Sequence, residues 1–202
     1  MRLRSSRRML RVVLLGIFTV SSFLGARYPM AEQDTAVSEA VTGGPFQLTS
    51  HRNEQVTDAT YAENHMLIYF GYTFCPDLCP LGLQTMMTAY DELLKVTQDA
   101  VTPIFVTIDP ERDTVSVMAD YVDLFHPDLI GLTGSSDEIA AIAKAYRVFY
   151  AKVTNNESPA DYLVNHSVST YLMGPNSNYI ARFKHDSSPD EIATVIKEAL
   201  GS

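Results

Sequence analysis

The chain has 202 residues, of which 46% are hydrophobic, and its ordinary glycine and proline content excludes a fibrous or wholly disordered protein. Residues 1–30 carry six arginines and no acidic residue, so the remainder holds nine basic against 24 acidic residues, a net charge of −15. We therefore expect one globular domain and no nucleic-acid partner.

The arginine-rich start runs directly into Val12–Ala26, which contains no charged residue. This pattern is typical of an export signal or a membrane anchor. A small-x-small cleavage site is missing near Ala26, so we expect residues 1–26 to remain as an anchor, with cleavage as the alternative. In both cases the domain should lie on the outer, periplasmic-type side of a membrane.

Residues 27–44 are rich in small and polar residues and end in two glycines before Pro45, which is typical of a linker. We expect residues 45–202 to form a single folding unit. Its first elements are short strands at Phe46–Leu48 and around Val56, followed by a compact apolar strand at Met66–Phe70.

Apolar residues then recur at three-to-four spacing from Pro80, which predicts a helix. The apolar positions of this helix are Leu83, Met86, Met87, Tyr90, Leu93 and Leu94. Val101–Ile108 is the next expected strand, and an amphipathic helix should follow it. The apolar positions of this second helix are Met118, Tyr121, Val122 and Phe125.

Capping residues mark the remaining helices. Ser135 and Glu138 form a capping-box pattern before a third helix, and Ser188 followed by Pro189 predicts the start of the last helix. Between these two helices we expect the strands Val148–Val153, Val168–Met173 and Tyr179–Phe183, of which the last two form a hairpin. The alternation predicts an α/β fold, a thioredoxin-like central sheet flanked by helices, preceded by the membrane segment.

The only two cysteines, Cys75 and Cys79, lie between the strand at Met66–Phe70 and the helix expected from Pro80. Pro80 disfavours a helical conformation at Cys79, so we expect the pair at or just before the helix N-terminus. The positive end of the helix dipole favours the thiolate there, and the thiolate is the form that attacks disulfides and binds metals.

Three interpretations of the cysteine pair compete. A structural disulfide is common in exported proteins, but closing so short a loop removes little chain entropy. A redox pair usually has two intervening residues, and this pair has three. The third interpretation is that both sulfurs bind one ion, in which case the soft thiolates favour copper(I) or zinc.

Two thiolates leave an ion in need of a third ligand, and the chain has five histidines. His166 directly precedes the strand at Val168–Met173, which should run close to the active edge of the sheet. From its position alone, His166 could equally be a metal ligand or an ordinary loop histidine. The other four have the setting of solvated or loop residues: His51, His65, His126 and His185.

Four ordered blocks of the sequence resemble the Sco/SenC proteins, which are copper chaperones for cytochrome c oxidase. The resemblance extends from about Gly44 to Phe183. The blocks are Tyr69–Thr73 with Cys75–Pro80, Val106–Thr114, Gly131–Gly134, and Val164–Ser167 with Tyr171–Met173.

The resemblance implies a thioredoxin-like fold and one copper ion, as Cu(I) or Cu(II), bound by Cys75, Cys79 and His166. It also implies that the chain delivers copper or electrons to the binuclear copper site of cytochrome c oxidase subunit II, with another copper donor or a thiol reductant as further partners. Asp109, in the second block, is not among the implied ligands, and a role in capping or turn formation is as consistent with its position. Asn165 stands where the family usually has an aspartate, which leaves open how the imidazole is oriented.

Two functions from different classes therefore remain open. A metallochaperone carries copper and need not turn over a substrate, and we expect this function rather than an enzyme. The alternative is a thiol-disulfide oxidoreductase that reduces the cysteines of the oxidase copper site or of another exported protein through a Cys75–Cys79 disulfide. His166 distinguishes the two, because copper binding needs it and simple disulfide exchange does not.

Overall fold

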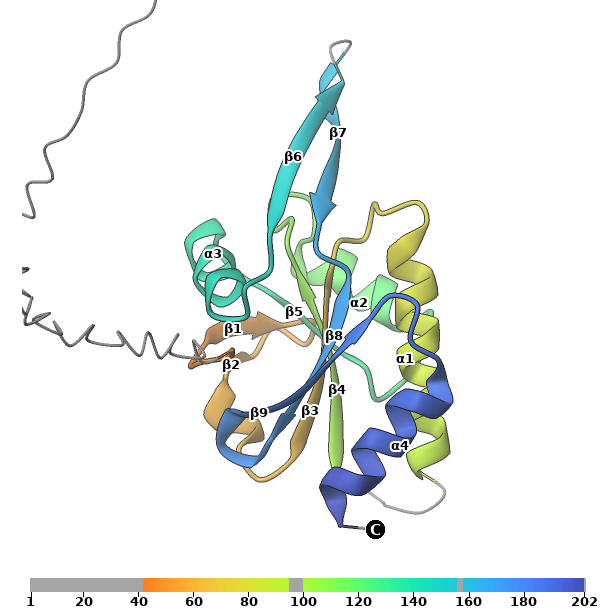
Figure 1. Cartoon of the computed structure of the whole chain (residues 1–202). Helices are drawn as coiled ribbons and strands as arrows, with labels where there is room; N and C mark the ends of the chain where they lie inside the picture. The colour runs from red at the N-terminus through yellow and green to blue at the C-terminus, as the bar shows by residue number, and fades with distance from the viewer. Residues whose placement is uncertain (1–41, 95–99, 156–157, 202) are drawn as a thin grey trace, which may run out of the picture. The chain divides into compact units, whose positions relative to one another are not determined.

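The computed structural model describes residues 42–94, 100–155 and 158–201 (Figure 1). A seven-stranded sheet lies at its centre, in the order β2-β1-β5-β4-β3-β8-β9, and the remaining strands, β6 and β7, pair only with each other. The strands are β1 (Gln47–Ser50), β2 (Gln55–Thr57), β3 (His65–Gly71), β4 (Val101–Thr107), β5 (Ile130–Thr133), β6 (Tyr150–Asn155), β7 (Ser158–His166), β8 (Ser169–Gly174) and β9 (Asn178–Lys184).

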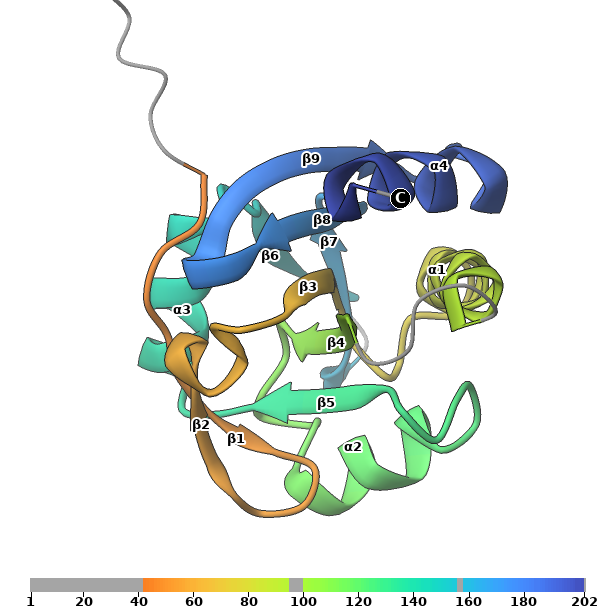
Figure 2. The same ribbon diagram turned by 90° about the horizontal axis from the view of Figure 1, so that it is seen from below.

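Four α-helices and two short 3-10 helices accompany the strands. They are α1 (Leu78–Leu94), α2 (Val115–Val122), α3 (Ser136–Ala145), α4 (Pro189–Leu200), η1 (Asp58–Tyr61) and η2 (Pro175–Ser177). Figure 2 shows α1 and α4 together on one side of the sheet and α3 on the opposite side. Helices therefore cover both faces of the central strands.

The sheet is mixed. Its centre is parallel, with β3 paired to β4 and β4 to β5, whereas β8, β9, β1 and β2 add antiparallel strands at the two sides. Strands covered on both faces have near-continuous apolar sequences, and six of the seven residues of β3 are buried. The arrangement is the predicted thioredoxin-like α/β fold.

Helix starts follow the capping residues. The Ser135 hydroxyl accepts a hydrogen bond from the Glu138 backbone N–H, and the Glu138 carboxylate accepts one from the Ser135 N–H, which completes the predicted capping box. At α4 the Ser188 hydroxyl accepts a hydrogen bond from the Glu191 N–H. These side chains satisfy N–H groups that have no partner within the helix.

The structure corrects the sequence analysis at the start of α1. The helix begins at Leu78, two residues before the expected start at Pro80, so Cys79 is at the helix N-terminus, as expected, but already in the first helical turn. Pro80 is tolerated because the first backbone N–H groups of a helix have no intrahelical acceptor to lose. The bias that proline imposes on the preceding residue is therefore overridden here.

Two strands were not predicted. β5 is short and contains Gly131, and β7 contains Pro159 and Asp161, all of which are depleted in strands. In the structure β7 pairs antiparallel with β6 to form a ribbon that projects beyond the main sheet (Figure 1). His166 is the last residue of this ribbon, directly before the turn into β8.

The expected anchor at residues 1–26 and nearly all of the expected linker lie outside the described residues. Within the described part of the chain, no helix has the length and apolar character needed to cross a membrane. The anchor remains a prediction from the sequence.

Replacement of a core residue of β3 tests the fold. Leu67 is fully buried at the middle of the sheet, so Leu67→Ala should lower the free energy of unfolding by about 3 kcal/mol through lost burial and a residual cavity. Leu124→Ala is the matched control, because this leucine is 78% exposed and its truncation should change stability by less than about 0.5 kcal/mol. Chemical denaturation followed by circular dichroism measures both, and equal effects would contradict the assigned core.

Candidate metal centre

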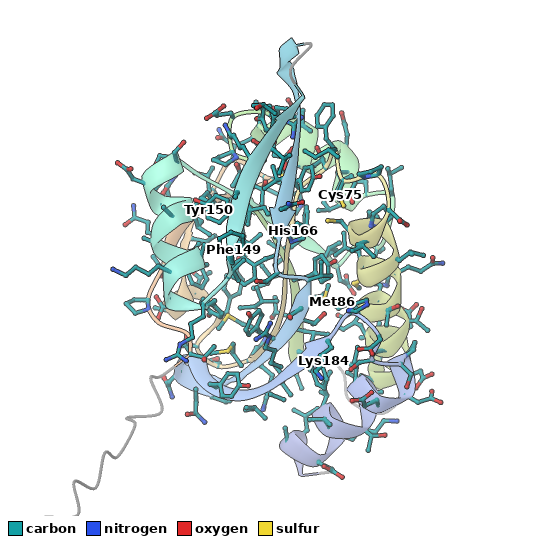
Figure 3. The ribbon with its side chains drawn as sticks, turned by 45° about the horizontal axis from the view of Figure 1, so that its top comes forward. Cys75, Met86, Phe149, Tyr150, His166 and Lys184 are labelled. Atoms are coloured by element: carbon teal, nitrogen blue, oxygen red, sulfur yellow. The ribbon has the colours of Figure 1, made fainter. Side chains whose placement is uncertain are left out.

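Two segments far apart in the sequence meet at the carboxyl end of β3. The loop after β3 carries Cys75, the first turn of α1 carries Cys79, and the end of β7 carries His166. Cys75 and His166 are labelled in Figure 3. One donor atom from each of the three lies within 4.8 Å of the other two. Cys79 Sγ is 3.4 Å from His166 Nε2, although the two residues are 87 positions apart.

The three donors differ in exposure. Cys79 is fully buried, whereas Cys75 and His166 are partly exposed. Both cysteines are free thiols. The site is therefore closed behind Cys79 and open to solvent at Cys75.

The pKa values of the two thiols are shifted in opposite directions. A hydrogen bond from the Cys79 thiol is the main cause that lowers the pKa of Cys75, and contacts with His166 and with the backbone N–H groups of Asp77 and Cys79 add to it, while burial opposes it. The Cys79 N–H lies 3.4 Å from Cys75 Sγ. The pKa of Cys79 is raised, first because its proton is held by Cys75 and second because of burial. Cys75 is thus the sulfur that carries negative charge first.

Asp113 holds the cysteine loop in place. Its buried carboxylate accepts hydrogen bonds from the backbone N–H of Thr73 at 3.0 Å, from the Thr73 hydroxyl at 2.6 Å and from the Thr107 hydroxyl. Burial raises the pKa of Asp113. The sequence analysis did not identify this residue, because its main partner lies 40 positions away.

Asp109 holds the histidine strand. Its carboxylate is fully buried and accepts a hydrogen bond from the Tyr162 hydroxyl at 2.7 Å on one oxygen, while the other oxygen is paired with Arg112. Arg112 also donates to the Tyr162 carbonyl at 3.0 Å, and its guanidinium stacks 3.7 Å from the centre of the Tyr162 ring. Asp109 therefore has a structural role, and the three-donor cluster found among the described residues does not include it.

His166 is oriented by its own turn. Its Nδ1 lies 3.0 Å from the Ser167 carbonyl oxygen, and because a carbonyl only accepts, Nδ1 must carry the proton. This leaves Nε2, the atom nearest Cys79, free to bind a metal. The ring also packs edge to face on Tyr72, with the ring centres 5.8 Å apart. Asn165 is exposed, so the Ser167 carbonyl supplies the hydrogen bond that an aspartate could otherwise provide.

The other four histidines lie outside the donor cluster, although His65, expected in a polar loop, is the first residue of β3. His126 Nε2 is 3.2 Å from the Asp91 carboxylate, and its Nδ1 accepts a hydrogen bond from the Asp128 N–H at 3.1 Å. His51 Nδ1 accepts from the Gly131 N–H at 3.0 Å. Of the described histidines, His166 is the one in a donor cluster.

The cluster fits a soft metal ion. Two sulfurs on opposite sides of one ion are about 4.6 Å apart when each metal–sulfur bond is about 2.3 Å, so donors within 4.8 Å of one another can converge with small side-chain rotations. Two thiolates and one imidazole are the donor types that bind copper or zinc.

Comparison with known proteins gives consistent results. Residues 34–201 match the SCO1/SenC family. The chain is 42% identical over 166 residues to human "Protein SCO1 homolog, mitochondrial", which covers 82% of this chain and 55% of the human protein. It is 39% identical over 167 residues to Rhodobacter capsulatus "Protein SenC", covering 83% and 74% of the two chains. The chain spans 50–60% of the length of the first curated relatives that it matches.

Solved structures match over the described domain. The crystal structure of Arabidopsis thaliana ScoI with copper bound superposes with a TM-score of 0.73 at 40% identity, covering 79% of this chain and 99% of the other. Yeast Sco1 with copper bound gives a TM-score of 0.74 at 33% identity, with coverages of 80% and 90%.

The lowered pKa of Cys75 predicts how its reactivity depends on pH. Alkylation of Cys75 by iodoacetamide should proceed at a nearly constant rate from pH 8 to pH 6, whereas an ordinary thiol with a pKa of about 8.5 loses nearly tenfold per unit. Mass spectrometry of peptides from the reduced protein measures the rate at each cysteine.

Cys79→Ala is the control, because it removes the hydrogen-bond donor and should restore a steep fall in Cys75 reactivity as the pH decreases. A steep fall in the unsubstituted protein, or faster modification of Cys79 than of Cys75, would contradict the assignment.

Proposed function

The chain belongs to the SCO1/SenC family, and on that premise we propose that it is a copper protein of cytochrome c oxidase assembly. One copper ion is bound by Cys75, Cys79 and His166. The observation that carries this proposal is the convergence of two sulfurs and one imidazole nitrogen within 4.8 Å from segments 87 residues apart. The copper-bound relatives, at 40% and 33% identity over most of the described domain, support copper over zinc.

The copper ion is a cargo, and the protein supplies its ligands. Cu(I) accepts two thiolates, so Cys75 and Cys79 suffice for that oxidation state, whereas Cu(II) prefers an additional nitrogen donor, which His166 provides. The thiolate character of Cys75 and the proton on His166 Nδ1 leave a lone pair free for the metal on each of these two side chains. The proposed recipient is the binuclear copper site of cytochrome c oxidase subunit II.

Exposed apolar side chains lie close to Cys75 in the sequence. Phe74, Leu78 and Leu81 are 58%, 43% and 58% exposed, and all three lie within six residues of Cys75. Large apolar side chains at the surface are typical of contact with a protein partner. They support transfer by direct contact with another protein rather than by release of free copper.

Thiol-disulfide exchange is the second candidate function, and the exposure of the two sulfurs favours it. The accessible Cys75 thiolate would attack a disulfide of the target and form a mixed disulfide, and Cys79, after losing its proton, would then displace the target thiol. Two electrons pass to the target, the Cys75–Cys79 disulfide forms, and a thiol reductant must reduce it again. His166 has no necessary part in this sequence.

The N-terminal sequence and the relatives support a proposed position of the protein in the cell. We place residues 1–26 in a membrane and residues 45–202 on its periplasmic-type side, joined by residues 27–44. The arginines at the start support this orientation, because positive charge is retained on the cytoplasmic side. Several SCO1 relatives are described as mitochondrial.

Substitution of His166 separates the two functions. His166→Ala should weaken Cu(II) binding by at least about 100-fold and Cu(I) binding by less than about tenfold, because two thiolates satisfy Cu(I). Anaerobic titration of the reduced full-length protein in detergent, with a competing chelator and absorbance spectra, measures both affinities. Oxidase activity in a complemented deletion strain should be lost.

His126→Ala is the matched control, since its ring is bound by Asp91 and Asp128 and is not in the donor cluster. This variant should titrate like the unsubstituted protein. Unchanged Cu(II) spectra in His166→Ala, together with retained oxidase assembly, would favour the reductase.

The proposed topology predicts protease sensitivity. Cells are prepared with a permeabilised outer envelope and an intact inner membrane, and mild heat is used to unfold the domain. An added protease should then digest the domain, while a cytoplasmic marker stays protected. Recovery of the intact domain in the soluble cytoplasmic fraction would contradict the placement.

A further inference from the structure

Tyr72 joins the two segments that carry the donors of the metal centre. It is the first residue after β3, three positions before Cys75, and it is 2% exposed. Its backbone carbonyl accepts a hydrogen bond from the Cys75 N–H at 3.2 Å. Its hydroxyl accepts one from the backbone N–H of Val164 in β7, also at 3.2 Å, and its ring packs edge to face on His166. One residue thus contacts both the cysteine loop and the histidine strand.

The backbone of Tyr72 is anchored on both sides. The carbonyl of Gly71, the last residue of β3, accepts a hydrogen bond from the Ile108 N–H at 2.8 Å. On the other side, Thr73 donates two hydrogen bonds to the buried carboxylate of Asp113. The tyrosine ring therefore extends from an anchored base, and its hydroxyl offers β7 an acceptor at a defined place.

Val164 needs an acceptor outside the ribbon. The backbone N–H groups of a strand point alternately to its two edges, and β7 pairs only with β6. Val164 is 4% exposed, and a buried N–H without an acceptor is costly. The Tyr72 hydroxyl is that acceptor, and Val164 lies two residues before His166. The hydrogen bond therefore favours one position of β7 close to the point where the strand presents its imidazole.

We propose that Tyr72 is a positioning residue of the metal centre, which holds the His166 imidazole beside the two sulfurs through its hydroxyl and its ring. Both of these side-chain contacts are made with β7, so they act on the imidazole and not on the sulfurs. The hydroxyl should then matter for Cu(II), which takes His166 as a ligand, and little for Cu(I), which two thiolates satisfy. This inference rests on the proposed copper function.

Tyr72→Phe tests the inference, because phenylalanine keeps the ring and the backbone carbonyl and removes only the hydroxyl. The Val164 N–H loses its acceptor, so β7 leaves its position part of the time, and apparent affinity falls with the population that can bind. In the reduced full-length protein in detergent, Cu(II) affinity should fall by about tenfold, the loss expected for one unpaired buried N–H. Cu(I) affinity should fall by less than about twofold. Titration against a competing chelator measures both affinities.

A measurement on the metal-free protein tests the hydrogen bond itself. The Val164 amide hydrogen should exchange with deuterium at least about tenfold faster in Tyr72→Phe than in the unsubstituted protein, because opening of β7 no longer breaks this bond. Nuclear magnetic resonance of the reduced full-length protein measures the exchange rate.

Tyr121→Phe is the matched control for the loss of a phenol hydroxyl. Tyr121 lines a hollow beside the cysteine loop together with Thr73 and Phe74, and its hydroxyl has no hydrogen-bond partner among the described residues. This variant should keep both copper affinities and the Val164 exchange rate of the unsubstituted protein.

The His166→Ala background shows whether Tyr72 acts through the imidazole. If it does, adding Tyr72→Phe to His166→Ala should weaken Cu(II) binding no further, because the group that the hydroxyl positions is already absent. A residue that merely supports the fold would lower the affinity by the same factor in both backgrounds.

The possible results separate this inference from the proposed function. Unchanged Cu(II) affinity or unchanged Val164 exchange in Tyr72→Phe would overturn the inference while copper binding stands. Equal losses of Cu(I) and Cu(II) affinity, or the same loss in the His166→Ala background, would also overturn it, because the hydroxyl would then support the fold or the cysteine loop. If the unsubstituted protein binds no copper, the proposed function itself fails, and with it the role of Tyr72 at a copper site.

Discussion

The position of His166 depends on a buried ionic contact, the pairing of Asp109 with Arg112. As a strand, β7 pairs only with β6 and is not part of the central sheet, so pairing within the sheet does not fix the position of His166. A second link runs from the Val164 N–H of β7 to the Tyr72 hydroxyl, at 3.2 Å. The Asp109 carboxylate and the Arg112 guanidinium both bind Tyr162, four residues before His166. A buried charge is tolerated only when it is paired and hydrogen-bonded, and here that requirement fixes the ribbon to the loop after β4.

A single short turn supports both halves of the site. Asp109 holds the strand that carries His166, and Asp113, four residues later, holds Thr73 in the cysteine loop. The two carboxylates act in opposite directions along the chain from the same turn. The sequence block Val106–Thr114 therefore holds the cysteine loop and the histidine strand at a fixed separation. It contributes no donor atom to the cluster.

The sequence predicted the parts of the structure that depend on local signals. The cap at Ser135, the apolar face of α1 and the buried strands β3 and β4 follow from short-range pattern. β7 was missed because its partner is only β6 and its composition is that of a loop. His166 was selected by resemblance rather than by its own context, and Asp113 was not singled out, because its role depends on contacts with a residue distant in the sequence.

The unequal burial of the two sulfurs determines from which side an incoming ligand can approach the metal. An incoming ligand can reach an ion in this cluster from the side of the partly exposed Cys75 and His166, because Cys79 lies behind them with no exposed surface. Ligand replacement would then begin on that side and end at Cys79, with the incoming ligand bound before the last sulfur leaves. Such stepwise exchange keeps the metal coordinated throughout, so the rate of hand-over is set by encounter with the recipient and not by spontaneous dissociation.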